Sequence, residues 1–245
     1  MLALIAYLLT LIAVGIFGFQ GFKLFKIISA GQSDPTRFDN KGKRLKNMFV
    51  EVFSHTKMLN FTATGIAHWF VMIGFFALLG TLVTAYGQLI NPTWALPIIG
   101  HFVGYELFAE VIAALTGIGI VTLIAIRQVT RVVKSGRSSR FYGSGTLKAY
   151  YVEVTILAIV FCVVALRGLE GALLNKSGWN WHYAISYPAV LFFSKYSAIQ
   201  IENLIQVIAF TKIAVSMVWF IVVGLNLNMG IAWHRFLAFF NIYFK

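Results

Sequence analysis

Five long apolar stretches, each about as long as a bilayer-spanning helix, constrain this sequence more than any other feature. They cover residues 2–22, 62–89, 102–126, 149–166 and 201–231. A helix of about 20 apolar residues matches the hydrocarbon core of a bilayer, where only a helix or a closed barrel satisfies its backbone hydrogen bonds. The stretches are unbroken rather than alternating, which favours helices. We therefore predict an all-α membrane protein, a bundle of five transmembrane helices that forms a single domain over residues 1–245.

The composition agrees with lipid as part of the solvent. Of the 245 residues, 59% are hydrophobic and only 11% are charged, whereas a typical soluble domain has roughly 25% charged residues. The only cysteine is Cys162, so the chain cannot by itself form a disulfide or supply the thiolates of a zinc or iron–sulfur site. Any iron–sulfur cluster that works with this chain must belong to a partner or to a further domain.

The positions of the basic residues predict how the bundle is oriented. Two connections hold most of them, namely Lys23, Lys26, Arg37, Lys41, Lys43, Arg44, Lys46 and Lys57 in the first, and Arg127, Arg131, Lys134, Arg137, Arg140 and Lys148 in the second. Loops rich in Lys and Arg stay on the cytoplasmic side. We therefore expect the N-terminus outside and the C-terminus in the cytoplasm. We therefore attribute the net charge of +12 to basic residues that orient the protein in the membrane and contact anionic lipid. A nucleic-acid partner is not expected.

The first basic connection also contains an amphipathic pattern. Its apolar residues recur at helical spacing, at Leu45, Met48, Phe49, Val52 and Phe53. Its polar residues, Lys43, Arg44, Lys46, Asn47 and Glu51, take the opposite face. This pattern predicts a helix that lies on the membrane surface between the first and second spans.

The five histidines separate into a pair and three others once the topology is drawn. His68 lies near the cytoplasmic start of the second span and His234 at the cytoplasmic end of the fifth, so the two should lie at similar depth. Two facing imidazoles can serve as the axial ligands of one haem iron. Gly65 and Gly230 precede them by about one helical turn and leave space for a flat macrocycle. Alternatively, both histidines are interfacial residues without a cofactor.

The other three histidines are predicted to contact lipid headgroups or water. His101 and His182 fall in the outer loops, and His55 falls in the surface segment that precedes the second span. The sequence has no C-x-x-C-H motif, so a haem would be held without covalent bonds, as haem b.

Three segments together resemble a known family. They are Gly65 to Phe70 with Gly74 and Phe75, the stretch Ser139 to Ser144, and the C-terminal run WHRFLAFFNIYFK from Trp233 to Lys245. In this order they are similar to the N-terminal membrane domain of membrane-bound iron–sulfur oxidoreductases that pass electrons from electron transfer flavoprotein to quinone. That family is related to the membrane subunit of heterodisulfide reductase and to the gamma subunit of respiratory nitrate reductase.

The resemblance implies a membrane electron-transfer subunit or domain in a prokaryotic cytoplasmic membrane. It would carry haem b between His68 and His234 and relay electrons between a cytoplasmic iron–sulfur protein or flavoprotein and membrane quinone. Nitrate reductase gamma subunits hold two haems, with two histidines on each of the matching helices. Here no further histidine lies within 69–89 or 201–233, so we expect one haem. The Cys-rich part of the family is missing from this chain, which places the clusters on a partner or on a missing domain.

Charged residues in the outer half of the predicted spans form a second candidate site. Glu110 and Arg167 are predicted at similar depth, where an ion pair either stabilises the bundle or belongs to a quinone headgroup site that exchanges protons. A quinone site near the inner haem, flanked by Lys148, Tyr150, Tyr151 and Glu153, remains an alternative.

A second class of function fits the same sequence. In a haem-free membrane anchor or small transporter, Glu110, Arg167 and Lys212 would line a polar path and the histidines would sit at the interface. Transporters often have internal repeats and interrupted helices, and we expect neither from this sequence. Electron transfer is therefore the leading hypothesis.

Overall fold

The computed structural model of the chain describes residues 1–32, 34–130, 145–174 and 178–245, and all regular structure within them is helical. Four helices are long and apolar enough to cross a membrane: α1 (Leu2–Ser29), α5 (Val103–Thr130), α6 (Thr146–Leu173) and α8 (Ala198–Leu225). The prediction of an all-helical membrane protein is thereby confirmed. The segment Ser139 to Ser144, and the basic residues of 131–144, fall outside the described residues.

The predicted second span is a bent pair of helices, which corrects the expectation that no span is interrupted. α3 (Thr62–Ala77) and α4 (Leu79–Gln88) meet at an angle of 41°, and the pair counts as a fifth candidate span if it is taken as one. Leu78 lies at the bend, and the Thr81 hydroxyl donates a hydrogen bond of 2.7 Å to its carbonyl oxygen. A side-chain hydroxyl bonded to a helix carbonyl is a common cause of such a kink.

Several helices extend beyond the predicted apolar stretches. α1 continues to Ser29 instead of residue 22, and α6 covers 146–173 instead of 149–166. Charged residues are tolerated there because long side chains reach the interface. Lys23 and Lys26 show this at the end of α1, where their amines lie over the rings of Phe19 and Phe22. The added turns of α6 contain Arg167 and Glu170, which are thus helical residues.

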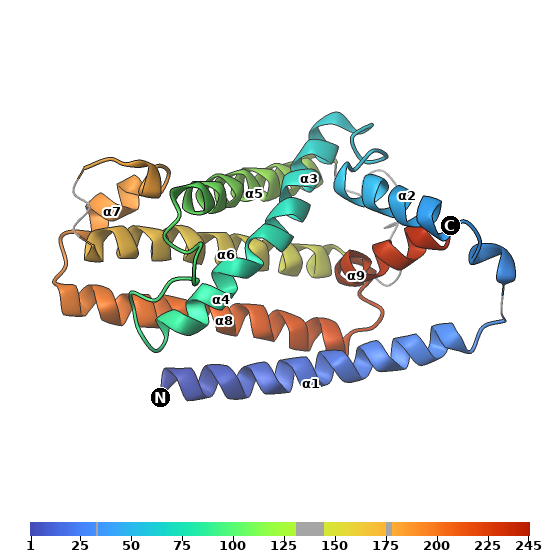
Figure 1. Cartoon of the computed structure of the whole chain (residues 1–245), viewed down its shortest axis with the longest axis horizontal. Coiled ribbons are helices and arrows are strands. Elements are labelled where there is room, and N and C mark those ends of the chain that lie inside the picture. The colour runs from blue at the N-terminus through green and yellow to red at the C-terminus, as the bar shows by residue number, and fades with distance from the viewer. Residues whose placement is uncertain (33, 131–144, 175–177) are drawn as a thin grey trace.

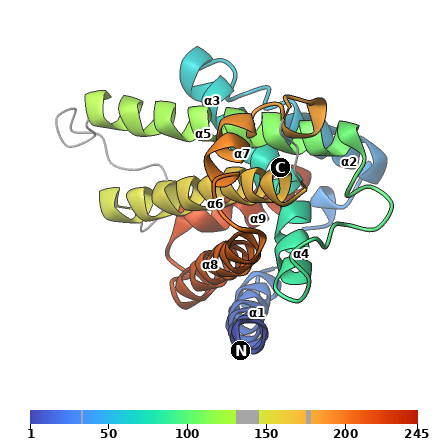
Figure 2. The same ribbon diagram turned by 90° about the vertical axis from the view of Figure 1, so that its left-hand side faces the viewer.

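The long helices form successive layers in the order α5, α6, α8 and α1, and α3–α4 crosses them, with α3 beside α5 and α4 beside α8 (Figures 1 and 2). One end of the bundle carries the short helix α7 (Tyr187–Phe193) and the turn η2 (Trp181–Tyr183), and we call it the α7 end. The other end carries α2 (Lys41–Phe53), α9 (Gly230–Tyr243) and the turn η1 (Pro35–Arg37), and we call it the α9 end.

Small residues let the central helices approach closely. A Cβ atom added at Gly74 of α3 would overlap the Thr116 side chain of α5, and one added at Gly119 would lie 2.7 Å from the Ala67 carbonyl oxygen. Helices in lipid associate mainly through such tight contacts, because apolar tails give no hydrophobic drive between helices. The α3–α5 contact therefore fixes where the first turns of α3 lie.

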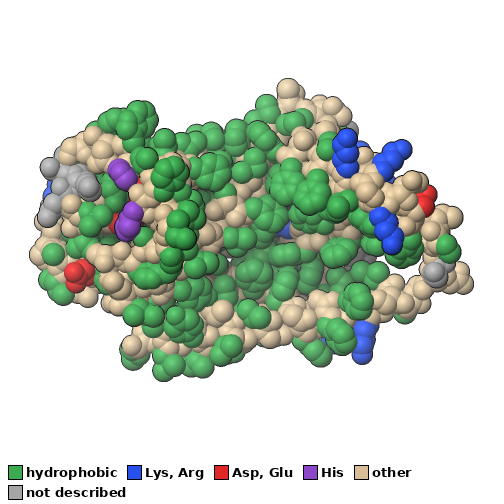
Figure 3. All heavy atoms as spheres, in the orientation of Figure 1, with side chains coloured by type: hydrophobic (Ala, Val, Ile, Leu, Met, Phe, Trp, Pro, Cys, Tyr) green, Lys and Arg blue, Asp and Glu red, His purple; other side chains and the backbone are tan. Residues whose placement is uncertain are grey.

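At the α9 end, the predicted amphipathic segment is a helix, α2, and it packs against α9. The Phe53 ring lies 6.4 Å from the Phe239 ring, and Arg44 donates to the Lys245 carbonyl oxygen at 2.9 Å. On the face drawn in Figure 3, Lys and Arg side chains gather mostly at this end, and a broad hydrophobic band separates them from the acidic and histidine side chains at the α7 end.

We expect Gly74→Ala to weaken the bundle by about 1–3 kcal/mol, because the new methyl group forces α3 and α5 apart. Gly18→Ala on α1 is the matched control, since nothing lies within 4 Å of a Cβ added there. Equilibrium unfolding in mixed micelles measures both changes. Equal stability of the two variants would contradict the close α3–α5 contact.

Candidate haem-ligating histidine cluster

His68 and His234 lie side by side. His68 is on the second turn of α3 and His234 is on the second turn of α9, and their ring centroids are 6.0 Å apart with 37° between the ring planes. Two imidazoles that each hold a nitrogen about 2.0 Å from one metal ion have centroids roughly 6 Å apart. The spacing of the two rings therefore suits axial ligation of a single iron.

The structure corrects how His234 reaches this position. The predicted fifth span ran to residue 231 with His234 at its end, but α8 stops at Leu225 and His234 belongs to the separate helix α9. The Trp233 indole nitrogen donates to the carbonyl oxygens of Val223 and Asn226, each at 3.2 Å. The same indole stacks on Phe17 of α1 with centroids 4.9 Å apart. These contacts turn α9 back over the bundle and bring His234 to α3.

The surroundings of His234 favour the neutral imidazole. Burial lowers the pKa of its side chain to about 4, although hydrogen bonds with the backbone of Ile231 and Gly230 act in the opposite direction. At neutral pH the ring therefore keeps a nitrogen lone pair, which a metal ligand requires. Gly230, which was predicted to leave room for a macrocycle, thus starts α9 and contributes backbone hydrogen bonding to the ligand candidate.

Gly65 has a different role from the predicted one. A Cβ at this position would overlap the Met58 carbonyl group and lie 2.9 Å from the Leu59 Cα atom. The space beside Gly65 is occupied by the connection between α2 and α3, so it is not available to a porphyrin. The glycine instead lets this connection pack closely against the first turn of α3.

His55 joins the pair, which the sequence analysis did not predict. Its Nε2 atom lies 2.9 Å from His68 Nδ1, and its Nδ1 atom lies 2.8 Å from the Val52 carbonyl oxygen. The sequence placed His55 at the lipid headgroups because it precedes the second span. Its backbone has φ +47°, a left-handed conformation that L-residues rarely adopt and that often marks functional sites.

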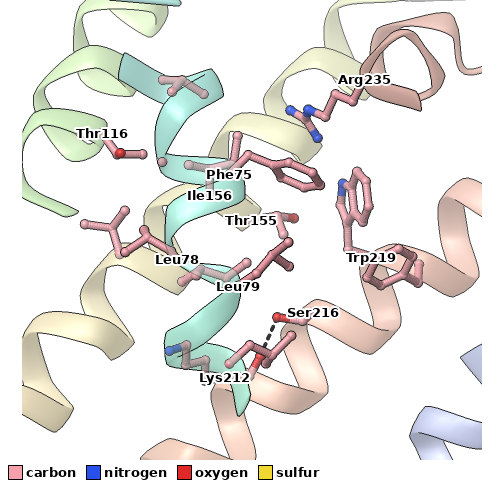
Figure 4. A pocket seen from close by; sticks show the side chains of 16 residues that line it. Phe75, Leu78, Leu79, Thr116, Thr155, Ile156, Lys212, Ser216, Trp219 and Arg235 are labelled. Atoms are coloured by element: carbon pink, nitrogen blue, oxygen red, sulfur yellow. Dashed lines mark hydrogen bonds between the residues drawn. The ribbon is translucent and has the colours of Figure 1, made fainter. Parts of the chain in front are cut away.

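A small apolar cavity lies next to the histidines, inside the bundle. Its volume is about 80 Å³, and its lining on α3 begins at Val71, one turn after His68. Figure 4 shows Arg235, the neighbour of His234, pointing into it between Phe75 and Trp219; the guanidinium carbon lies 5.4 and 5.3 Å from their ring centroids. A porphyrin is larger than this cavity, so its entry requires these side chains to rearrange. The two candidate ligands thus lie side by side, whereas the cavity next to them does not have the volume of a porphyrin.

The second candidate site lies at the α7 end and is centred on Arg167. Its guanidinium contacts Glu110 at 3.4 Å, Glu106 at 3.2 Å and Glu170 at 2.8 Å, and it also donates to the His182 carbonyl oxygen. The ion pair between Glu110 and Arg167 is thus present. Glu106 in addition contacts the His182 ring, which links the cluster to the loop that contains η2.

Glu110 holds that loop in place. Its carboxylate accepts hydrogen bonds from the backbone of Ile185 at 2.8 Å and Ser186 at 3.2 Å, and from the Ser186 hydroxyl. The side chain is buried, at 2% exposure, and these donors together with Arg167 occupy its oxygens. This geometry favours the structural alternative for the Glu110–Arg167 pair, because donors already occupy the carboxylate oxygens of Glu110. The proton exchange with a quinone stays a prediction.

Other polar residues of the spans also have partners. Lys212, at 1% exposure, donates to the Thr81 carbonyl oxygen at 2.8 Å and to its hydroxyl at 2.7 Å. Around the alternative inner site, Glu153 pairs with Arg127 at 2.6 Å, and Lys148 donates to Asn228 at 3.3 Å. Two buried oxygens lack a hydrogen-bond partner among the described residues: one carboxylate oxygen of Glu153, and the Tyr105 hydroxyl, which lines a cavity of about 40 Å³ together with Lys212.

Comparison of the chain with protein-family models, with curated proteins and with solved structures gives no match.

Replacing Arg167 with Met should cost about 3–5 kcal/mol of unfolding free energy, because it leaves buried carboxylates without their counter-charge. Arg37→Met is the matched control, since the Arg37 side chain is 56% exposed and pairs with Asp34 on the surface, where an ion pair contributes about 0–1 kcal/mol. Urea titration in mixed micelles compares the two variants. An equally small loss in both would show that the Arg167 cluster does not stabilise the α7 end.

Proposed function

We propose that this chain is a membrane electron-transfer subunit or domain that holds one haem b between His68 and His234. The observation that supports this most directly is the 6.0 Å spacing of the two rings, which come from helices far apart in the sequence. A bound haem would supply one-electron chemistry, and its potential depends on the ligands and on their hydrogen bonds. The protein would supply two neutral imidazoles, an apolar environment and the orientation of both rings.

The proposed orientation has the α9 end in the cytoplasm and the N-terminus outside. The concentration of Lys and Arg side chains at this end (Figure 3) supports it. The amphipathic α2 would then lie on the inner membrane surface, with its basic residues toward anionic headgroups. The histidine cluster would face the cytoplasmic side of a prokaryotic membrane, next to the site where a soluble redox partner docks.

The proposed partners follow from what the chain lacks. Cys162 is its single cysteine, and it is buried, so iron–sulfur clusters would sit on a cytoplasmic partner or on a missing domain. Electron transfer flavoprotein would serve as a donor upstream, and membrane quinone would be the second electron carrier. In that complex the chain is the membrane part of a quinone-linked oxidoreductase, and no nucleic acid takes part.

The haem assignment can be tested on the purified chain with a pyridine haemochrome assay and a reduced-minus-oxidised spectrum. We expect one b-type haem per chain, and loss of the haem signal in His68→Ala and in His234→Ala. His182→Ala is the control, because His182 lies at the α7 end, and it should retain the signal.

Two results would contradict the proposal. A folded, colourless preparation made with full haem supply would favour the haem-free anchor or small transporter. Retention of the haem in both His68→Ala and His234→Ala would place the ligands elsewhere. Helix content by circular dichroism separates loss of haem from loss of fold.

A further inference from the structure

We propose that His55 is a positioning residue that fixes the tautomer and the orientation of His68, and so prepares one specific nitrogen of His68 for a metal. This inference rests on the proposed haem site, and it concerns a residue that would not touch the iron itself. It follows from a chain of two hydrogen bonds and from the way the backbone holds His55.

The direction of the hydrogen bonds follows from the first acceptor. The Val52 carbonyl oxygen can only accept, so the His55 Nδ1 atom 2.8 Å away must donate its hydrogen. In the neutral ring the His55 Nε2 atom then carries a lone pair and accepts a hydrogen bond from His68 Nδ1, 2.9 Å away. The His68 proton therefore resides on Nδ1, and its Nε2 atom keeps the lone pair.

This tautomer is the one that an Nε2-ligated haem needs. A ligating histidine usually donates its other ring N–H to an acceptor, which fixes the ring orientation and makes the ligand more basic. His234, the other candidate ligand, interacts with the backbone of its own helix. His68 instead obtains its acceptor from a third histidine outside its helix, and that acceptor is anchored in turn to the end of α2.

The backbone around His55 is held firmly in place. The Leu59 amide donates to the His55 carbonyl oxygen at 3.0 Å, and the Trp69 indole of α3 donates to the Phe53 carbonyl oxygen at 2.8 Å. On the other side of the connection, Met58 and Leu59 pack so closely against Gly65 that a Cβ atom at this position would overlap the Met58 carbonyl group. The left-handed His55 is thus fixed from α2 and from α3, and its ring is aimed at His68.

The first experiment does not depend on haem. Long-range proton–nitrogen correlation spectra of haem-free protein in nanodiscs, with nitrogen-15 in the histidines, report the tautomer of each ring. The His68 signals are assigned by their loss in His68→Leu. We expect the Nδ1–H form of His68 in the native chain, and a shift toward the Nε2–H form in His55→Leu, because the acceptor is gone.

The second experiment measures the loaded protein. His55→Leu should retain haem roughly 10–100-fold more weakly, and its midpoint potential should rise, because a less basic imidazole stabilises the ferric state less. His55→Gln offers an amide oxygen as the acceptor and should restore part of both properties. His101→Leu is the matched control, since His101 is exposed and lies outside this cluster, and it should change neither.

The outcomes separate this proposal from the haem assignment. An unchanged His68 tautomer in His55→Leu overturns the role of His55, whether or not the chain binds haem. Unchanged haem retention and potential in a folded His55→Leu variant overturn it as well. If the chain binds no haem but His55→Leu shows the expected tautomer shift, the role of His55 in orienting His68 is supported. In that case only the proposed haem function is refuted.

Discussion

Lipid offers no hydrogen-bond partner, so every polar group inside the spans must find one within the protein. The structure follows this constraint closely at its charged residues. Lys212 binds the carbonyl and hydroxyl oxygens of Thr81, and Arg167 binds three carboxylates. The same need explains why the larger polar clusters lie at the two ends of the bundle, where loops can supply backbone donors and acceptors, whereas Lys212 in the middle of α8 has Thr81 as its partner.

The two ends use their polar residues in different ways. At the α7 end, Glu110 and Arg167 bond to each other and to residues 182–186, and so tie that loop to α5 and α6. At the α9 end, the polar centre consists of the imidazoles of His55, His68 and His234. A charge network stabilises the first, and hydrogen bonds directed from α2 and α9 arrange the second. The α9 end brings the rings of His68 and His234 side by side, and at the α7 end His101, Glu106 and Glu170 form a group that could hold a metal ion.

The sequence predicted the helical bundle and the proximity of His68 and His234. Hydropathy placed each histidine near the end of an apolar stretch, and the distribution of basic residues predicted that both ends lie on the same side of the membrane. The sequence could not predict His55, since the position depends on a left-handed backbone in a short connection. The break between α8 and α9 was missed although Asn226, Asn228 and Gly230 interrupt the apolar run between Leu225 and Ile231, and these residue types are common in turns. The anchoring role of Glu110 depends on the backbone amides of Ile185 and Ser186. Hydrophobic periodicity does not reveal a contact between residues so far apart in the sequence.

The return of α9 over the bundle has a consequence for biogenesis. His55 and His68 leave the ribosome early, whereas His234 follows only after the last long helix has been made. The third imidazole can join the others only when Trp233 has found its place against Phe17 and α8. The cluster therefore joins an early and a late part of the sequence, so a cofactor held there would require α3 and α9 to be in place together.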